Sequence, residues 1–279
     1  YFNKYNMPKS VYSLFFLLFG LFESIVVAND LDVKKSQWNG FERHDFKYKG
    51  VKSLLVIPDS PAKGFPWVWR ARFFGHQPQA DIELLKRGFH LAYCDVAGLF
   101  GNQVAVERWN EFYQMLITQK GLSKKPALEG MSRGGLIIYN WASVNPGRVS
   151  CIYGDAPVCD IRSWPGGKGK GKGGGSAWKA ALKAHRITDE ESKSAKVSPI
   201  HKLKPIANAG IPILHVVGAA DKVVPVDENS EIIEKKYKEL GGNIHVISKP
   251  GIGHHPHALK DPRPIVDFIL KHSLKIKVD

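Results

Sequence analysis

The sequence predicts an α/β protein with a doubly wound, mostly parallel sheet and a small cap insertion. Apolar, strand-like runs alternate with helical patterns at short intervals along most of the chain, and this alternation is typical of crossover units around a parallel sheet. The interior runs 65–74 and 211–217 are almost continuously apolar. Strands covered by helices on both faces have this character, whereas half-exposed strands alternate.

The predicted elements follow one another with few long interruptions. The two opening strands, 41–48 and 51–57, are expected to form an antiparallel edge of the sheet. The remaining strands are predicted at 65–74, 89–96, 126–131, 149–153, 211–217 and 243–248. Helices are predicted at 80–87, 104–120, 136–144, 178–185, 229–240 and 264–272.

The section from about residue 157 to 200 breaks this rhythm. It begins with a tract rich in Gly and Lys, from Gly166 to Gly175, and continues with a short helical pattern. In α/β sheets, ligands bind at the carboxyl edge, and insertions there shape the site. We therefore expect this section to form a small cap over that edge.

Residues 1–28 are predicted to be a signal peptide, and residues 29–279 one hydrolase domain. Lys4 and Lys9 precede an apolar run from Val11 to Phe22, and small residues near Ala28 suit a cleavage site. A retained membrane anchor is the alternative, although the strongly apolar part is short for a bilayer span. The expected location is secreted or periplasmic, without stable membrane insertion after cleavage.

The composition fits a globular enzyme with an affinity for anions. The net charge is +14, which attracts acidic partners in general. The chain contains no zinc-finger spacing and no RNA-binding signature, so nucleic acid is not an expected partner. Among the three cysteines, Cys151 and Cys159 are the pair that could form a disulfide, while Cys94 is expected to be a buried small hydrophobe.

A candidate nucleophile lies between a predicted strand and a predicted helix. The segment from Gly130 to Gly134 has the pattern G-x-S-x-G, with Ser132 at its centre. A sharp strand-to-helix turn exposes such a serine at the sheet edge and requires small neighbours. The alternative is a serine in an ordinary glycine turn, which the flanking strand and helix make less favourable.

Two further residues supply the base and the orienting acid that a nucleophilic serine needs. Asp221 follows the buried strand 211–217, and His254 follows the last strand. Both therefore lie at the same sheet edge as Ser132. Their order along the chain, Ser then Asp then His, is the order expected for this type of fold.

Together these segments resemble the α/β-hydrolase superfamily, from about Val51 onward. The resemblance implies Ser132 as the nucleophile, His254 as the general base and Asp221 as the orienting acid. His255 is the alternative base, and Asp155 or Asp160 is the alternative carboxylate.

The resemblance also implies an oxyanion hole. The backbone N–H of Arg133 is the expected first donor. The second should come from the loop after the strand 65–74, where the HGGG-type segment of lipases is absent. We favour Arg70 over Arg72 there, with structural ion pairs as the alternative role for both.

Arg133 directly after the nucleophile resembles the elbow of glucuronoyl esterases, which are secreted carbohydrate esterases. A cationic pocket would suit a uronate, because arginine pairs with carboxylates in a bidentate manner. Trp164 and Trp178 flank the Gly/Lys tract and either stack on sugar rings or pack the cap. The resemblance to prolyl-oligopeptidase-like domains is of similar strength, but no propeller domain accompanies it.

The predicted function is hydrolysis of a carboxylic ester through an acyl-enzyme, on acetylated or methyl-esterified, acidic poly- or oligosaccharides. The alternatives are a small serine peptidase or lipid esterase of the same fold, and an inactive glycan-binding protein. No cofactor is expected. The stretch 169–174 matches G-x-G-x-x-G but follows no strand, so no dinucleotide site is predicted. The closely spaced His254, His255 and His257, with Asp261, do not have the spacing of a helical zinc pair, so no metal is predicted.

Overall fold

The computed structural model describes residues 31–274, and these residues form one compact unit. The predicted signal peptide, residues 1–28, lies outside the described residues. Among the described residues, no helix is both long enough and apolar enough to cross a bilayer.

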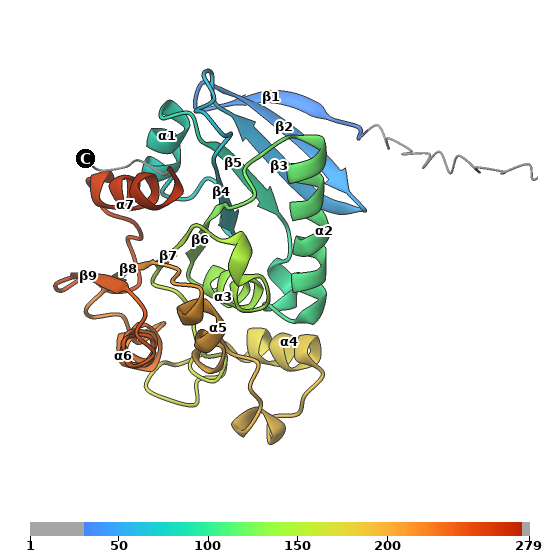
Figure 1. Cartoon of the computed structure of the whole chain (residues 1–279). Helices are drawn as coiled ribbons and strands as arrows, with labels where there is room; N and C mark the ends of the chain where they lie inside the picture. The colour runs from blue at the N-terminus through green and yellow to red at the C-terminus, as the bar shows by residue number, and fades with distance from the viewer. Residues whose placement is uncertain (1–30, 275–279) are drawn as a thin grey trace, which may run out of the picture. The chain divides into compact units, whose positions relative to one another are not determined.

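A single nine-stranded sheet forms the centre of this unit, in the order β1-β2-β3-β5-β4-β6-β7-β8-β9 (Figure 1). The strands are β1 (Lys34–Trp38), β2 (Phe41–Tyr48), β3 (Val51–Ile57), β4 (Trp67–Ala71), β5 (His90–Cys94), β6 (Ala127–Met131), β7 (Cys151–Asp155), β8 (Ile213–Gly218) and β9 (Ile244–Lys249). The pairs β1–β2, β2–β3 and β3–β5 are antiparallel. The remaining pairs, β5–β4, β4–β6, β6–β7, β7–β8 and β8–β9, are parallel. The predicted α/β class and mostly parallel sheet are confirmed.

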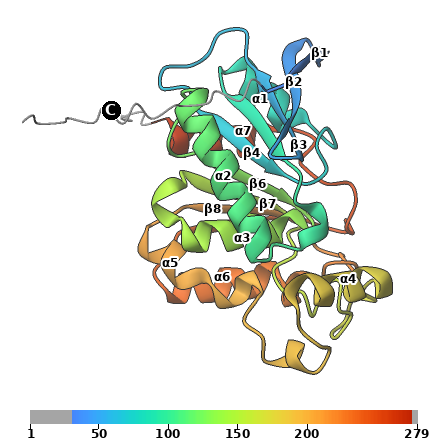
Figure 2. The same cartoon turned by 90° about the vertical axis from the view of Figure 1, so that its right-hand side faces the viewer.

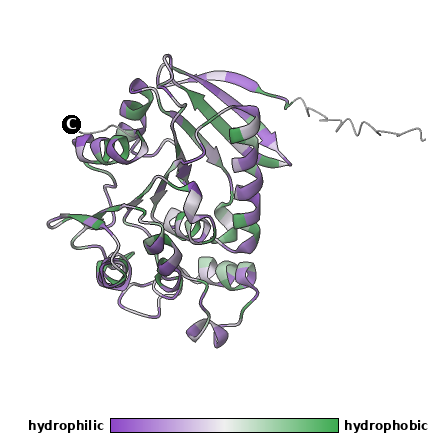
Figure 3. Cartoon of the chain, viewed as in Figure 1, coloured by the Kyte–Doolittle hydropathy of each residue, from purple (hydrophilic) through white to green (hydrophobic). Residues whose placement is uncertain are grey.

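Helices cover both faces of this sheet (Figures 1 and 2). Their bounds are α1 (Gln79–Lys86), α2 (Gln103–Gln119), α3 (Gly134–Val144), α4 (Gly175–His185), α5 (Leu203–Asn208), α6 (Ser230–Glu239) and α7 (Arg263–Ser273). Helices α1 and α7 pack together on one face, and α2, α3, α5 and α6 form the layer on the other. This double coverage explains why every residue of β4, β5, β6, β7 and β8 is buried. Figure 3 shows hydrophobic and hydrophilic residues interspersed along the covering helices.

Aromatic side chains fill the core between the sheet and α2. Trp69 on β4 stacks on Trp109 of α2 with ring centroids 3.9 Å apart, and Trp141 of α3 meets Trp69 edge-on at 5.2 Å. All three are fully buried. Stacked and edge-on pairs are the arrangements that aromatic rings prefer, so this cluster fixes both helices against the strand.

The section after β7 has a small apolar cluster of its own. It is built around α4, where Trp178 and Ala181 pack with Ile161 and Val158, and Phe100 joins from the loop after β5. The remainder of the section consists of turns and 3-10 segments before α5 and β8. Helix α4 contacts the 3-10 turn Ala97–Leu99, at the end of β5.

The cysteine prediction is corrected by the structure. Cys94, Cys151 and Cys159 are all free and buried. Cys151 packs with the side of the sheet that faces α7, whereas Cys159 belongs to the core cluster on the other side. The sheet therefore separates the two thiols that sequence spacing suggested as a pair.

His215 on β8 is a buried histidine that the structure uses as a core hydrogen-bonding group. Its Nε2 lies 2.6 Å from the Tyr139 hydroxyl, and its Nδ1 lies 3.0 Å from the Ser230 hydroxyl. Burial lowers the pKa of His215 to about 3. The ring is therefore neutral across the physiological pH range.

This burial predicts acid sensitivity. In the unfolded chain His215 binds a proton near pH 6.5, whereas in the folded chain it binds one only near pH 3. Between these two pH values the unfolded state binds more protons, so the free energy of unfolding falls as the pH is lowered. We expect His215→Gln to be less stable at pH 7 but to lose up to about 3 kcal/mol less than wild type between pH 7 and pH 4. Urea unfolding followed by tryptophan fluorescence measures both. The exposed His245→Gln serves as control, and equal pH dependence in all three proteins would contradict the assignment.

Candidate active site

The turn between β6 and α3 holds Ser132 in a left-handed backbone conformation, with φ of 49°. Its backbone N–H donates to the Asp155 carbonyl at 2.8 Å, and its own carbonyl accepts from Val158 N–H at 2.8 Å. A residue with a side chain adopts this conformation only at a cost, so the surrounding hydrogen bonds must maintain it. The turn thereby presents the serine at the carboxyl edge of the sheet, with 9% of the residue exposed.

The glycines around Ser132 are required by close approaches. A methyl group at Gly130 would lie 2.5 Å from Ile138 Cδ1, and one at Gly135 would lie 2.6 Å from the Val158 carbonyl oxygen. A methyl at Gly134 would overlap the Ala71 carbonyl oxygen at the end of β4. The G-x-S-x-G pattern therefore allows α3 to start directly against β4 and β6.

Ser132, His254 and Asp221 form a continuous hydrogen-bonded chain. Ser132 Oγ lies 3.0 Å from His254 Nε2, and His254 Nδ1 lies 2.7 Å from Asp221 Oδ2. The side chains of His254 and Asp221 are 7% and 1% exposed. This is the geometry of a nucleophile, a base and an orienting acid.

Backbone contacts fix the acid and the base in place. Asp221 Oδ1 accepts from the N–H groups of Val223 and Val224 at 2.8 and 2.9 Å. Burial alone would raise the pKa of Asp221, but the hydrogen bonds from His254 and from these N–H groups outweigh it and lower the pKa. Ala220 N–H donates to the Ile252 carbonyl at 2.8 Å, so the loops after β8 and β9 are joined next to the site.

Solved structures of hydrolases and peptidases share this architecture. They include puromycin hydrolase (TM-score 0.60, 18% identity, 86% of this chain, 37% of the other) and a Mycobacterium tuberculosis puromycin-hydrolyzing peptidase (0.60, 15%, 85%, 38%). Porphyromonas gingivalis dipeptidyl peptidase 4 is a third (0.64, 13%, 85%, 36%). The chain spans less than two fifths of the length of each. No family model and no curated protein matches the sequence.

The chain has the α/β-hydrolase fold. Within this fold, the structure gives the alternative triad residues other partners. Asp155, at the end of β7, binds His257 Nδ1 at 2.6 Å, and Asp160 pairs with Arg162 at 2.7 Å. His255 is exposed and makes no hydrogen bond to Ser132, whereas His254 makes one.

The side chain of Arg70 does not reach the site. The prediction that Arg70 is an oxyanion or substrate-binding residue is therefore wrong. Its side chain is 1% exposed and pairs with the buried carboxylates of Asp81 and Glu129. It also donates to the His76 carbonyl at 2.5 Å. Burial, and then the charge of Asp81, raises the pKa of Glu129 well above its usual value. The hydrolase fold here uses Arg70 as an internal ion-pair residue.

Removing Arg70 should therefore affect stability first. Arg70→Leu leaves the Asp81 carboxylate buried without its cation, so we expect a loss of about 3–5 kcal/mol in the free energy of unfolding. Lys86→Met removes an exposed ion pair with Glu83 and should cost less than about 1 kcal/mol. Urea denaturation of both variants measures the difference, and losses of similar size would show that the buried pair is not structural.

The arginines near the elbow are instead Arg133 and Arg72. The Arg133 guanidinium lies 5.7 Å from the Phe73 ring centroid and 5.5 Å from that of Trp164, and Arg72 lies 4.8 Å from Phe73. Neither arginine forms an ion pair within residues 31–274. Burial, and then the charge of Arg72, lowers the pKa of Arg133. Two uncompensated cations thus lie beside the nucleophile.

The backbone directly after β4, at Arg72 and Phe73, has an unusual conformation. Their φ angles are 73° and 48°, and Gly134 packs against this segment, with Arg72 Cβ 3.4 Å from a methyl placed there. Arg72 is among the residues that the sequence suggests for this site, whereas Phe73 is not. A run of two left-handed residues without glycine has no signature in the sequence.

The two tryptophans that flank the Gly/Lys tract have different surroundings. Trp164 is half-buried and contacts Arg133. Trp178 is 9% exposed, lies in the α4 cluster and donates to Asp189 Oδ1 at 2.6 Å. Only Trp164 is therefore positioned near the nucleophile, while Trp178 packs the section around α4.

The Gly/Lys tract precedes α4 as a loop, and an acidic side chain binds its backbone. The Glu228 carboxylate accepts from Lys170 N–H, and Glu228 Oε2 also accepts from the Ser163 hydroxyl at 2.6 Å. A carboxylate at these N–H groups competes with a phosphate for the same donors. Glu228 therefore already occupies the backbone donor of Lys170 within residues 169–174.

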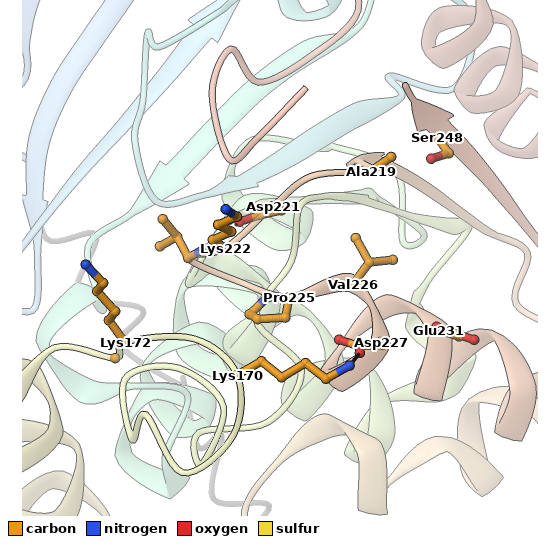
Figure 4. A pocket seen from close by; sticks show the side chains of 12 residues that line it. Lys170, Lys172, Ala219, Asp221, Lys222, Pro225, Val226, Asp227, Glu231 and Ser248 are labelled. Atoms are coloured by element: carbon orange, nitrogen blue, oxygen red, sulfur yellow. Dashed lines mark hydrogen bonds and ion pairs between the residues drawn. The ribbon is translucent and has the colours of Figure 1, made fainter. Parts of the chain in front are cut away.

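A pocket of about 940 Å³ opens on the far side of the acid (Figure 4). Lys170, Lys172 and Lys222 line it, and Asp221 is the triad member on its wall. Lys170 pairs with Asp227 across the pocket, as Figure 4 shows. Neither Ser132 nor His254 belongs to its lining. This hollow is therefore separate from the space in front of the nucleophile.

Proposed function

We propose that the protein is a serine hydrolase that cleaves a carboxylic acyl bond through a covalent acyl-enzyme. The observation that carries this proposal is the hydrogen-bonded chain from Ser132 through His254 to Asp221. His254 Nε2 accepts the Ser132 proton as the hydroxyl oxygen attacks the carbonyl carbon. The same nitrogen then returns that proton to the leaving group, and water releases the acid in a second round.

The expected donors for the oxyanion are backbone N–H groups. Arg133 N–H lies at the N-terminus of α3, directly after the nucleophile. The second donor in our proposal is a backbone N–H of the segment Arg72–Phe73, because this segment packs against the same turn. Such fixed donors stabilise the charge that develops on the carbonyl oxygen.

Ser132→Ala tests the proposed nucleophile. A fluorophosphonate probe should label the wild-type protein and leave this variant unlabelled, because the probe reacts with an activated serine hydroxyl. Intact mass spectrometry shows whether one adduct forms, and peptide mapping shows where. The buried structural Ser192→Ala is a matched control that should retain labelling. Labelling of Ser132→Ala to the wild-type extent would reject the proposal.

Two substrate classes remain open within this chemistry. An amide or peptide bond is favoured by the structural neighbours, whose names include two peptidases and a puromycin hydrolase. An ester of an acidic sugar is favoured by the cationic Arg133 against Trp164, because aromatic rings stack on sugars and arginine binds carboxylates. Turnover of aminoacyl amides, peptides, sugar acetates and uronate methyl esters distinguishes the classes.

The charge of Arg133 should govern preference for an anionic substrate in either class. Arg133→Met keeps most of the apolar stem and the backbone N–H but removes the guanidinium. We expect kcat/KM for an anionic substrate to fall about tenfold or more, since a hydrogen bond to a charged group contributes about 1.5–3 kcal/mol. A neutral analogue of the same substrate should be affected much less. Lys179→Met on the exposed side of α4 controls for net charge, and an equal loss on both substrates would contradict this role.

A further inference from the structure

Four histidines gather beside the nucleophile, and the proposed chemistry uses only one of them. His254, His255 and His257 lie on the loop after β9, with ring centroids 4.7–5.0 Å apart. His76, from the loop after β4, meets His255 and His257 edge-on at 6.3 and 5.9 Å. One ring nitrogen from each of the first three lies within 4.8 Å of the nitrogens of the other two.

Two of these rings are held by buried carboxylates in the manner of metal ligands. Asp221 binds His254 Nδ1 at 2.7 Å, and Asp155 binds His257 Nδ1 at 2.6 Å. In metal sites, a ligating histidine usually donates its second ring N–H to a carboxylate, which fixes the tautomer and makes the other nitrogen a better donor. With Nδ1 bound to a carboxylate in each ring, Nε2 is the nitrogen that remains for a metal ion.

The Asp155–His257 pair has no part in the proposed chemistry of Ser132, His254 and Asp221. Asp155 is 1% exposed and also accepts from the Tyr153 hydroxyl and the Ala258 N–H, both at 2.6 Å. His257 Nε2 makes no hydrogen bond within residues 31–274, although its Nδ1 is held by Asp155. A rigidly oriented imidazole with a free nitrogen next to two others is a typical part of a metal site.

We propose that His254, His255 and His257 bind one divalent transition-metal ion of the Zn²⁺ type, and that this ion inhibits the hydrolase. Neutral imidazoles suit Zn²⁺, Cu²⁺ and Ni²⁺ rather than Mg²⁺ or Ca²⁺. Three nitrogens around a tetrahedral Zn²⁺ lie about 3.3 Å apart at Zn–N distances of about 2.0–2.1 Å. The three ring nitrogens, which lie within 4.8 Å of one another, must therefore come closer together when the ion binds. The exposed His255 allows this movement, because its ring can rotate without disturbing the core.

Inhibition follows from the lone pair of His254. Its Nε2 faces the Ser132 hydroxyl at 3.0 Å and must accept that proton for the serine to attack. A metal bound to Nε2 occupies the same lone pair, so the base is lost while the ion is bound. This part of the inference rests on the proposed function, whereas the metal site itself does not.

Calorimetric titration of the full chain with ZnCl₂, in a buffer without chelators, tests the binding. We expect one ion per chain for the wild type and for the exposed β9 control His245→Gln. His257→Gln and His255→Gln should each weaken binding at least tenfold, and Asp155→Asn should weaken it by about 10–100-fold. The exposed His255 side chain makes no hydrogen bond within residues 31–274, so His255→Gln remains informative should a buried variant fail to fold. Wild-type protein that binds no Zn²⁺, or unchanged affinity in His255→Gln and His257→Gln, would overturn the site.

The rate of fluorophosphonate labelling at increasing Zn²⁺ tests the inhibition. Labelling should slow in step with the occupancy measured by calorimetry, and a chelator should restore it. Ser132→Ala should bind Zn²⁺ at least as tightly as the wild type, because the hydroxyl no longer competes for Nε2. Zn²⁺ binding without slower labelling would refute the inhibitory role. Absence of labelling without Zn²⁺ would reject the proposed function and leave the calorimetric result intact.

Discussion

The active-site edge depends on Asp155, the last residue of β7. Its carbonyl oxygen accepts the Ser132 N–H that holds the strained turn, and its carboxylate binds both His257 and the Ala258 N–H. One residue therefore connects Ser132 to the loop that carries His254. Burial would raise the pKa of Asp155, but the hydrogen bonds from His257, Tyr153 and Ala258 outweigh this effect and lower it. The carboxylate remains ionised because every neighbour donates to it.

The arginines at this edge of the sheet differ in whether an acidic side chain neutralises their charge. Arg70 is buried against two acidic side chains, so its charge has no influence on a ligand. Arg72 lies two residues further along the chain, beyond the end of β4, and faces Arg133 instead of an acid. The left-handed backbone at Arg72 changes the direction of the chain at this point. Two arginines close together in sequence therefore have opposite roles, one structural and one available to an anion.

Sequence patterns predicted the parts of the site that depend on local geometry. Strand, turn and helix around Ser132 are encoded by apolar periodicity and by three glycines, and the positions of Asp221 and His254 follow from strands that end at one edge. The exposed strand β1, KKSQW, was missed because it buries no apolar face, and the short α5 was missed because Pro205 lies within it. The choice of Arg70 over Arg72 was wrong because the partners of Arg70 come from a helix and another strand, and no local pattern encodes such contacts.

The same convergence that builds the triad also builds the histidine cluster. The carboxyl ends of β7 and β8 each deliver a buried carboxylate, and one short loop after β9 delivers an imidazole to each of them. Only the imidazole bound to Asp221 has a serine hydroxyl at its second nitrogen; the one bound to Asp155 has none among the described residues. Spacing along a helix does not describe these histidines, because a loop brings neighbours together without helical periodicity. The fold orients one histidine by a buried acid and repeats that arrangement 4.7 Å away, so the same backbone geometry that supports the proposed base also supports the proposed metal site.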